Sequence, residues 1–158
     1  QCMRTTLFLL SCLVSSISFA DVVTCQGHLR NETIDRNVLV TQKCILDNVK
    51  IHGNIEVQPQ GSLTLKRSQV SGNITAKAGF GGVDLMENRI AGNVEILGGK
   101  RAELVRNQVV GSIDIQNNSG KIILRKNQSQ SLNCVENRIL PLGDNNQATT
   151  KTEQCVSL

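Results

Sequence analysis

The chain has 158 residues, a net charge of +4 and an aromatic content of only 2%, without Trp or Tyr. That length suits one domain with a modest core, which must be filled by rows of small aliphatic side chains instead of large rings. Lys and Arg are scattered among Asp and Glu, so the chain has neither the basic stripe nor the stacking rings of a nucleic-acid-binding protein.

Residues 1–20 contain the pattern of a secretory signal peptide, which reads MRTTLFLLSCLVSSISFA from Met3. One Arg precedes an apolar run, and Ser18 and Ala20 place small residues at the two positions that a signal peptidase inspects. We therefore expect cleavage after Ala20, with the first two residues as a gene-boundary artefact, and a secreted (extracellular or periplasmic) product. The run is too short and too rich in Ser for a transmembrane span. A lipobox at Cys12, which would anchor a lipoprotein, is the alternative.

Four cysteines remain once the predicted leader is removed, and an even number in an exported chain indicates disulfides. Two of them lie near each end of the chain, which favours Cys25–Cys44 and Cys134–Cys155 among the three possible pairings. A zinc site is the alternative, but the sequence has neither a CxxC motif nor a nearby pair of histidines. We therefore expect no metal and no cofactor.

A repeat of about 20 residues covers the centre of the chain, from 48 to 136. Such a period indicates a solenoid, in which each coil buries its inner face only by stacking on its neighbours. Each segment opens on Asn or Ser, and three of them continue into a G-N-I/V unit. The segments begin at Asn48, Ser68, Asn88, Asn107 and Asn127.

Apolar residues alternate with polar ones within each segment, which is typical of strands with one buried face. Aligned segments give apolar columns, so the sequence predicts an all-β, right-handed parallel β-helix (β-solenoid) with an aliphatic interior. Each buried Val, Leu or Ile contributes roughly 1.5–3 kcal/mol, which replaces the missing aromatic rings. Two clear columns are Ile55, Ile74, Val94, Ile113 and Leu132, and Leu65, Leu85, Leu104 and Leu124.

The residues that open the segments lie at a bend, where Asn tolerates left-handed backbone geometry. Stacked Asn side chains also hydrogen-bond along a ladder. We therefore predict an interior Asn ladder, with solvated turn residues as the alternative; its members are Asn48, Asn88, Asn107 and Asn127. A second bend requires positive φ or tight packing at Gly53, Gly72, Gly92 and Gly111.

Both ends are expected to carry disulfide-stapled caps, because open strand edges promote end-to-end growth. Segment 21–47 resembles an imperfect first coil, held by the first disulfide. The repeat is expected to stop after Cys134. The polar segment 137–158 would then fold over the last coil through a bridge to Cys155.

Three motifs together resemble a group of small exported bacterial proteins. They are C-x-G-x-L at 25–29, the repeated V-x-G-N-I/V units, and the stretch from Leu132-Asn133-Cys134 to Gln154-Cys155. Most members of that group are hypothetical secreted proteins, so the resemblance implies a fold and an export route but no activity. The coils are also similar, more distantly, to right-handed parallel β-helices of the pectate lyase class.

One outward column offers candidate cation ligands, namely Glu56, Glu95 and Asp114. Adjacent coils are about 4.8 Å apart, so Glu95 and Asp114 could share a Ca²⁺ of the kind that a β-helix lyase or hydrolase needs. Thr75 interrupts this column, and an alternating solvated face is the other interpretation. A neighbouring polar column, suited to sugar binding or to turn support, consists of Asn54, Asn73, Asn93, Ser112 and Asn133.

The sequence therefore predicts a monomeric, non-catalytic secreted or periplasmic module, structural or ligand-binding, with a cell-envelope or extracellular polysaccharide as its partner. One alternative is a polysaccharide-acting lyase or hydrolase. Another is an ice-binding or polymer-forming solenoid, although the outward columns lack the regular Thr-x-Thr row that ice binding requires.

Overall fold

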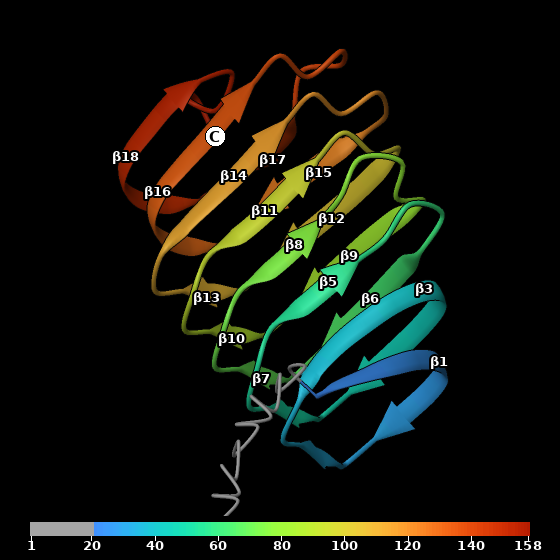
Figure 1. Cartoon of the computed structure of the whole chain (residues 1–158). Helices are drawn as coiled ribbons and strands as arrows, with labels where there is room; N and C mark the ends of the chain where they lie inside the picture. Colours follow the sequence, from blue (N-terminus) through green and yellow to red (C-terminus); the bar gives the residue numbers. More distant parts are fainter. Residues whose placement is uncertain (1–20) are drawn as a thin grey trace, which may run out of the picture.

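The computed structural model describes residues 21–158, so the predicted leader, its cleavage site and Cys12 lie outside the described residues. Between residues 21 and 158 the regular elements are all strands, and every strand pair is parallel. The strands build about seven turns of about 19 residues each, which confirms the predicted β-solenoid (Figure 1).

The coils stack into a prism with three faces, each of which is a parallel sheet that runs along the molecule (Figure 1). The first face contains β3 (Asn37–Asp47), β5 (Ile55–Val57), β8 (Ile74–Ala76), β11 (Val94–Leu97), β14 (Ser112–Gln116), β16 (Gln128–Val135) and β18 (Gln147–Glu153). The second face contains the end of β1 (Val22–Arg30), whose first residues lie on the first face, the end of β3, β6 (Ser62–Lys66), β9 (Gly82–Met86), β12 (Arg101–Val105), β15 (Ile122–Arg125) and β17 (Leu142–Asp144).

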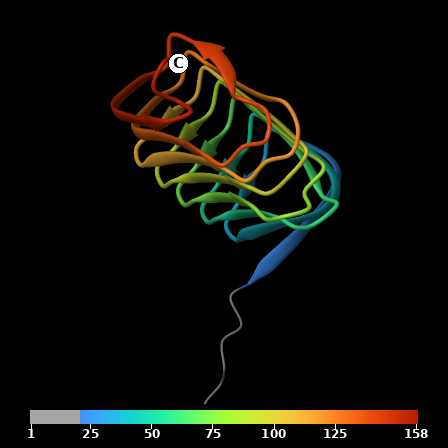
Figure 2. The same cartoon turned by 90° about the horizontal axis from the view of Figure 1, so that it is seen from above.

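The third face is the narrowest, because most of its strands are only two residues long. It contains β2 (Thr33–Ile34), β4 (Lys50–Ile51), β7 (Gln69–Val70), β10 (Arg89–Ile90), β13 (Gln108–Val109) and the first residues of β16 and β18. Figure 2 shows the same coils as closed loops that lie one above another.

The interior is filled by the apolar columns that the sequence predicts. Strand register places Ile55, Ile74, Val94, Ile113 and Leu132 side by side on the first face, and all five are buried. On the second face Leu46 precedes the predicted leucine column, which continues through Leu65, Leu85, Leu104 and Leu124. Aliphatic side chains therefore stack at the spacing of neighbouring strands, and those of the leucine column are identical.

A buried amide ladder lines the corner between the second and third faces. Nδ2 of Asn107 donates to Oδ1 of Asn127 over 3.0 Å and to the Leu85 carbonyl over 2.9 Å. Asn88 and Asn127 make the equivalent pairs of bonds, so each amide joins its own coil to both neighbours. The ladder consists of Ser68, Asn88, Asn107, Asn127 and Asn146, all of them buried.

Asn48 lies outside this ladder, contrary to the prediction. Its side chain is exposed and donates to Oδ1 of Asn31 over 2.8 Å. Val49 takes the inward position, where its backbone N–H donates to Oγ of Ser68, because the step from this corner to the next is 19 residues and not the 20 that the sequence alignment assumes. Asn48 instead has a φ of 53°, a left-handed conformation shared by the residue before each ladder member: Arg67, Glu87, Arg106, Lys126 and Asn145.

The corner between the first and second faces is filled in two different ways. In the N-terminal half, the buried ring of Phe80 lies against Gly99, where a Cβ would approach the ring to 2.2 Å. In the C-terminal half, a second amide row joins Asn118 to Asn137 and Asn137 to Gln154, with both bonds at 2.9 Å. The repeat does not predict this second row, because the row spans only three coils.

Both ends carry a disulfide, Cys25–Cys44 and Cys134–Cys155, which confirms the predicted stapled caps. The repeat does not stop after Cys134, however. Strands β17 and β18 pair in parallel with β15 and β16, so segment 137–158 holds one more coil before a short final turn. Polar residues take inward columns in this coil, as Lys151 does beside Leu132, which is why the apolar period is lost there.

Candidate functional site

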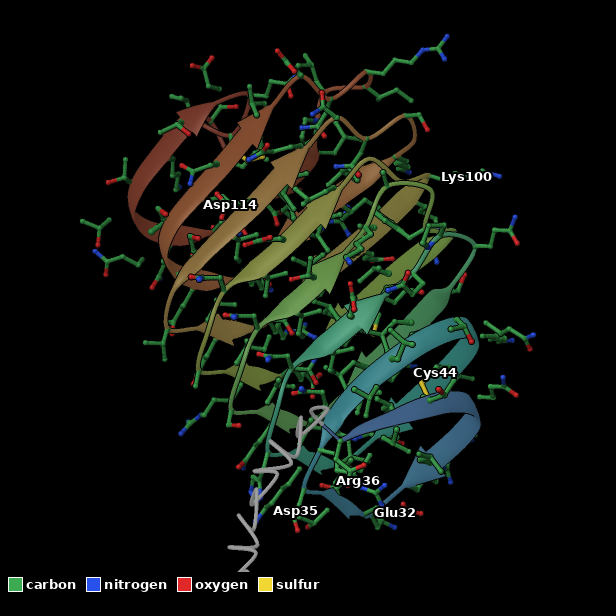
Figure 3. The ribbon with its side chains drawn as sticks, viewed as in Figure 1. Glu32, Asp35, Arg36, Cys44, Lys100 and Asp114 are labelled. Atoms are coloured by element: carbon green, nitrogen blue, oxygen red, sulfur yellow. A yellow bond between two sulfur atoms is a disulfide. The ribbon has the colours of Figure 1, made fainter. Side chains whose placement is uncertain are left out.

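The carboxylates predicted to hold a cation lie on the outer side of the first face. Register makes Glu56, Thr75, Glu95 and Asp114 neighbours on successive strands. Thr75 therefore keeps Glu56 two strand spacings, about 10 Å, from Glu95. The fold does not bring the three predicted ligands together, and Figure 3 shows Asp114 well along the molecule from the N-terminal coils.

Two of these three carboxylates are already engaged by neighbouring side chains. Asp114 accepts from Oγ of Ser112 over 2.7 Å and from Nδ2 of Asn133 over 2.8 Å. Glu56 is ion-paired with Lys77 on the next coil. Only Glu95 and Asp114 are adjacent, and residues 21–158 contain no cluster of three or more His, Cys, Asp or Glu that could hold a metal ion.

The polar column beside these carboxylates has a structural role. Oδ1 of Asn54 accepts the backbone N–H of Asn73 over 2.8 Å, and Asn73 and Asn93 repeat the bond to the next coil. A Cβ on Gly72 would lie 2.1 Å from this Asn54 oxygen, so tight packing rather than positive φ explains the glycines of this bend. Asn133 does not belong to this column, because it pairs with Asp114 and leaves the position to Ser131.

Ion pairs between consecutive coils cover the second face. Asp84 accepts hydrogen bonds from Nη1 and Nη2 of Arg101 over 2.7 and 2.8 Å, and both oxygens of Asp47 accept from Nη2 of Arg67 over 2.6 Å. The hydrogen bond to Asp84, together with its charge, raises the pKa of Arg101 above its ordinary value. Asp47 and Asp84 thus each lie beside an arginine from the following coil, and these ion pairs help to fix the strand register.

The third face presents one exposed side chain from each coil in a straight line. Successive residues are aligned by strand register, and we call them the third-face column. Each member after the first directly follows a ladder residue, so the sequence carries a visible signal of Ser or Asn followed by Gln or Arg. The column consists of Lys50, Gln69, Arg89, Gln108, Gln128 and Gln147.

Shallow depressions accompany this column along the third face. Arg89 is shared by the first and second of them, and Gln128 by the second and third. No Asp or Glu lines any of the three, whereas Glu56 lines the hollow on the first face and Asp84 the one on the second. Among the depressions on the three faces, those of the third face are therefore lined by cationic and amide side chains without any carboxylate.

Comparisons with protein-family models, with curated proteins and with solved structures give no match for this chain. The fold itself therefore defines the class, a parallel β-solenoid with a disulfide near each end. Within residues 21–158 no helix has the length and apolar character needed to cross a bilayer.

Proposed function

We propose that this chain is a non-catalytic, exported β-solenoid that binds an extended polysaccharide of the cell envelope or the extracellular space. The observation that carries the proposal is the straight third-face column, which aligns one exposed polar side chain per coil over six coils. Neighbouring strands lie about 4.8 Å apart, so the six side chains span about 24 Å. A linear array of that length suits a chain molecule better than a small ligand.

The chemistry of the column fits a carbohydrate. Gln amides supply both donors and acceptors, which match sugar hydroxyl groups, and Lys and Arg supply further donors. A nucleic acid is a poorer match because its bases are bound by stacking on aromatic rings. Phe80 is the only aromatic residue among 21–158, and it is fully buried.

Export is part of the proposal. The predicted leader supports it, and so do the two disulfides, which persist in oxidising compartments such as the periplasm and the extracellular space. The resemblance to small exported bacterial proteins points in the same direction. We propose that the mature protein acts there as a monomer.

A lyase or hydrolase is the alternative that the first face would have to support. Such an enzyme needs carboxylates free to bind Ca²⁺ or to transfer protons beside a basic group. Asp114 is held by Ser112 and Asn133, and Glu56 by Lys77, which favours binding without cleavage. Ice binding is also disfavoured, because the outward column of the first face mixes Thr75 with carboxylates.

The test is a panel of purified polysaccharides, neutral and charged, titrated into the mature protein by isothermal calorimetry. At least one extended polymer is expected to bind, while its monosaccharide gives no measurable heat. Each incubation is then analysed for shortened chains by mass spectrometry. Failure to bind any polymer, or the release of unsaturated or hydrolysed fragments, contradicts the proposal.

A further inference from the structure

We infer that the third-face column is the binding site and that its ligand is an anionic polysaccharide of the polyuronate class, an inference that rests on the proposed function. The first step is the charge of the surface. Lys50 and Arg89 are exposed and form part of a column that contains no carboxylate. Neither makes an ion pair within the described residues, in contrast to Arg67 and Arg101 on the second face.

Two of the three carboxylates nearest the column contact side chains of their own, whereas Glu32, exposed on the first coil, makes no ion pair. Glu87 lies at the corner just before it and is ion-paired with Arg106 over 3.7 Å. Asp35, on the first coil, contacts Nδ1 of His52 over 2.6 Å at the edge of the groove. Lys50 and Arg89 make no ion pair with any of these carboxylates, so both side chains are available to an anionic ligand.

The spacing of the two cations sets the geometry of the ligand. Gln69 stands between Lys50 and Arg89, so the cations are two strand spacings, about 10 Å, apart along the axis. A polyuronate offers carboxylates at regular intervals along an extended chain, with hydroxyl groups between them. The carboxylates would meet Lys50 and Arg89, and hydroxyl groups would meet the amide of Gln69.

The C-terminal half of the column extends the same contact with amides alone. Gln128 donates from Nε2 to Oε1 of Gln147 over 3.3 Å, which orders the two amides along the axis and leaves further donors and acceptors exposed. Beside them the rim is apolar, since Val110 is 70% exposed and lines the central depression. A sugar chain could place hydroxyl groups on the amides and its CH groups on this rim.

The deciding experiment compares the wild-type protein with two double variants that each remove one Lys and one Arg. Lys50→Gln with Arg89→Gln converts the column into a row of glutamines, and Lys43→Gln with Arg125→Gln is the matched control on the second face. All four side chains are exposed, so both variants should keep the thermal melting curve of the wild type. Fluorescently labelled polygalacturonate is titrated by anisotropy, and its fully methyl-esterified form removes the ligand charge.

We expect the column variant to bind polygalacturonate roughly tenfold more weakly than the wild type, with the control unchanged. Both the wild type and the column variant should bind the methyl ester with the same, weaker affinity. Equal binding by the column variant and the wild type, or an equal loss in the control, overturns the site. Preference for a neutral polysaccharide overturns the ligand class but leaves the proposed function standing. Tighter binding of oligothymidylate than of polygalacturonate overturns both.

Discussion

The amide of Asn107 and the amide of Asn127 are joined inside the protein by a hydrogen bond of 3.0 Å, and each also donates to a backbone carbonyl of the preceding coil. Both side chains are buried. Since buried polar groups cost free energy when they lose their partners, a ladder of this kind makes each coil depend on the next. Within residues 21–158 no buried side-chain nitrogen or oxygen lacks a hydrogen-bond partner.

Replacement of a ladder residue should therefore be costly. Asn107→Ala removes the acceptor of Asn88, the donor to Leu85 and the donor to Asn127, so we expect the free energy of unfolding to fall by about 3 kcal/mol. Asn48→Gly is the control, since Asn48 is exposed and its φ of 53° suits glycine. Urea unfolding followed by circular dichroism measures both. A loss in Asn48→Gly as large as that in Asn107→Ala would place Asn48 back in the ladder.

The contact between Phe80 and Gly99 gives a second prediction. Gly99→Ala places a methyl group against the ring and should destabilise the protein by about 1–3 kcal/mol. Phe80→Leu replaces the ring with a smaller side chain and should relieve part of that cost. The double variant should therefore lose less free energy of unfolding than the two single variants lose together. A double-mutant cycle measures the coupling. Strict additivity would show that the ring and the glycine do not interact.

The Asp84–Arg101 pair is expected to contribute little. Asp84→Asn should cost no more than about 1 kcal/mol, because the Arg101 side chain is 50% exposed, and the cost should shrink in 1 M salt. The pKa of Arg101 is higher in the folded state than in the unfolded state. Its contribution to the free energy of unfolding is therefore complete below the unfolded-state pKa and is lost as the pH rises through the folded-state pKa, and both values lie far above neutrality. The difference between variant and wild type should thus stay constant from about pH 6 to about pH 10.

Glu87→Gln is the matched control for that pair, because the Arg106–Glu87 pair is longer, at 3.7 Å, and both side chains are more than half exposed. It should leave the melting temperature unchanged. A cost for Asp84→Asn that rises with salt would argue against an electrostatic origin.

The disulfides should matter most at the ends. Each closes a loop of about 20 residues and is worth on the order of 3 kcal/mol in the chain-entropy model. Under a reducing agent, hydrogen exchange should speed up first in β1 and β18 while the central strands β8 and β11 stay protected. Loss of protection at the same rate in all strands would mean that the solenoid unfolds as one unit.

Much of the fold follows from the sequence because apolar columns repeat at a strand period. The predicted position of Asn48 was wrong because the sequence alone does not distinguish a step of 19 residues from a step of 20 residues to Ser68. Packing in the folded protein places Val49 inside and leaves Asn48 outside. The last coil was missed because Lys151 stands in an inward column that is apolar elsewhere.

The predicted cation ligands illustrate a different limit. Period-two alternation shows which residues point outward but not which partners they choose. The hydrogen bonds from Ser112 and Asn133 to Asp114 depend on side-chain rotamers, which cannot be read from the sequence pattern. The third-face column, by contrast, is visible in the sequence as Ser or Asn followed by Gln or Arg, although no chemical motif marks these residues as a site.

The most direct test of the third-face column as a polyuronate-binding site is the affinity of the mature protein for a length series of oligogalacturonates, measured by isothermal calorimetry. Affinity should rise with each added sugar until the oligomer spans the roughly 24 Å of the third-face column. Longer oligomers should then bind with the same affinity. A galacturonate monomer that binds as tightly as the longest oligomer, or an affinity that does not change with length, would contradict the account.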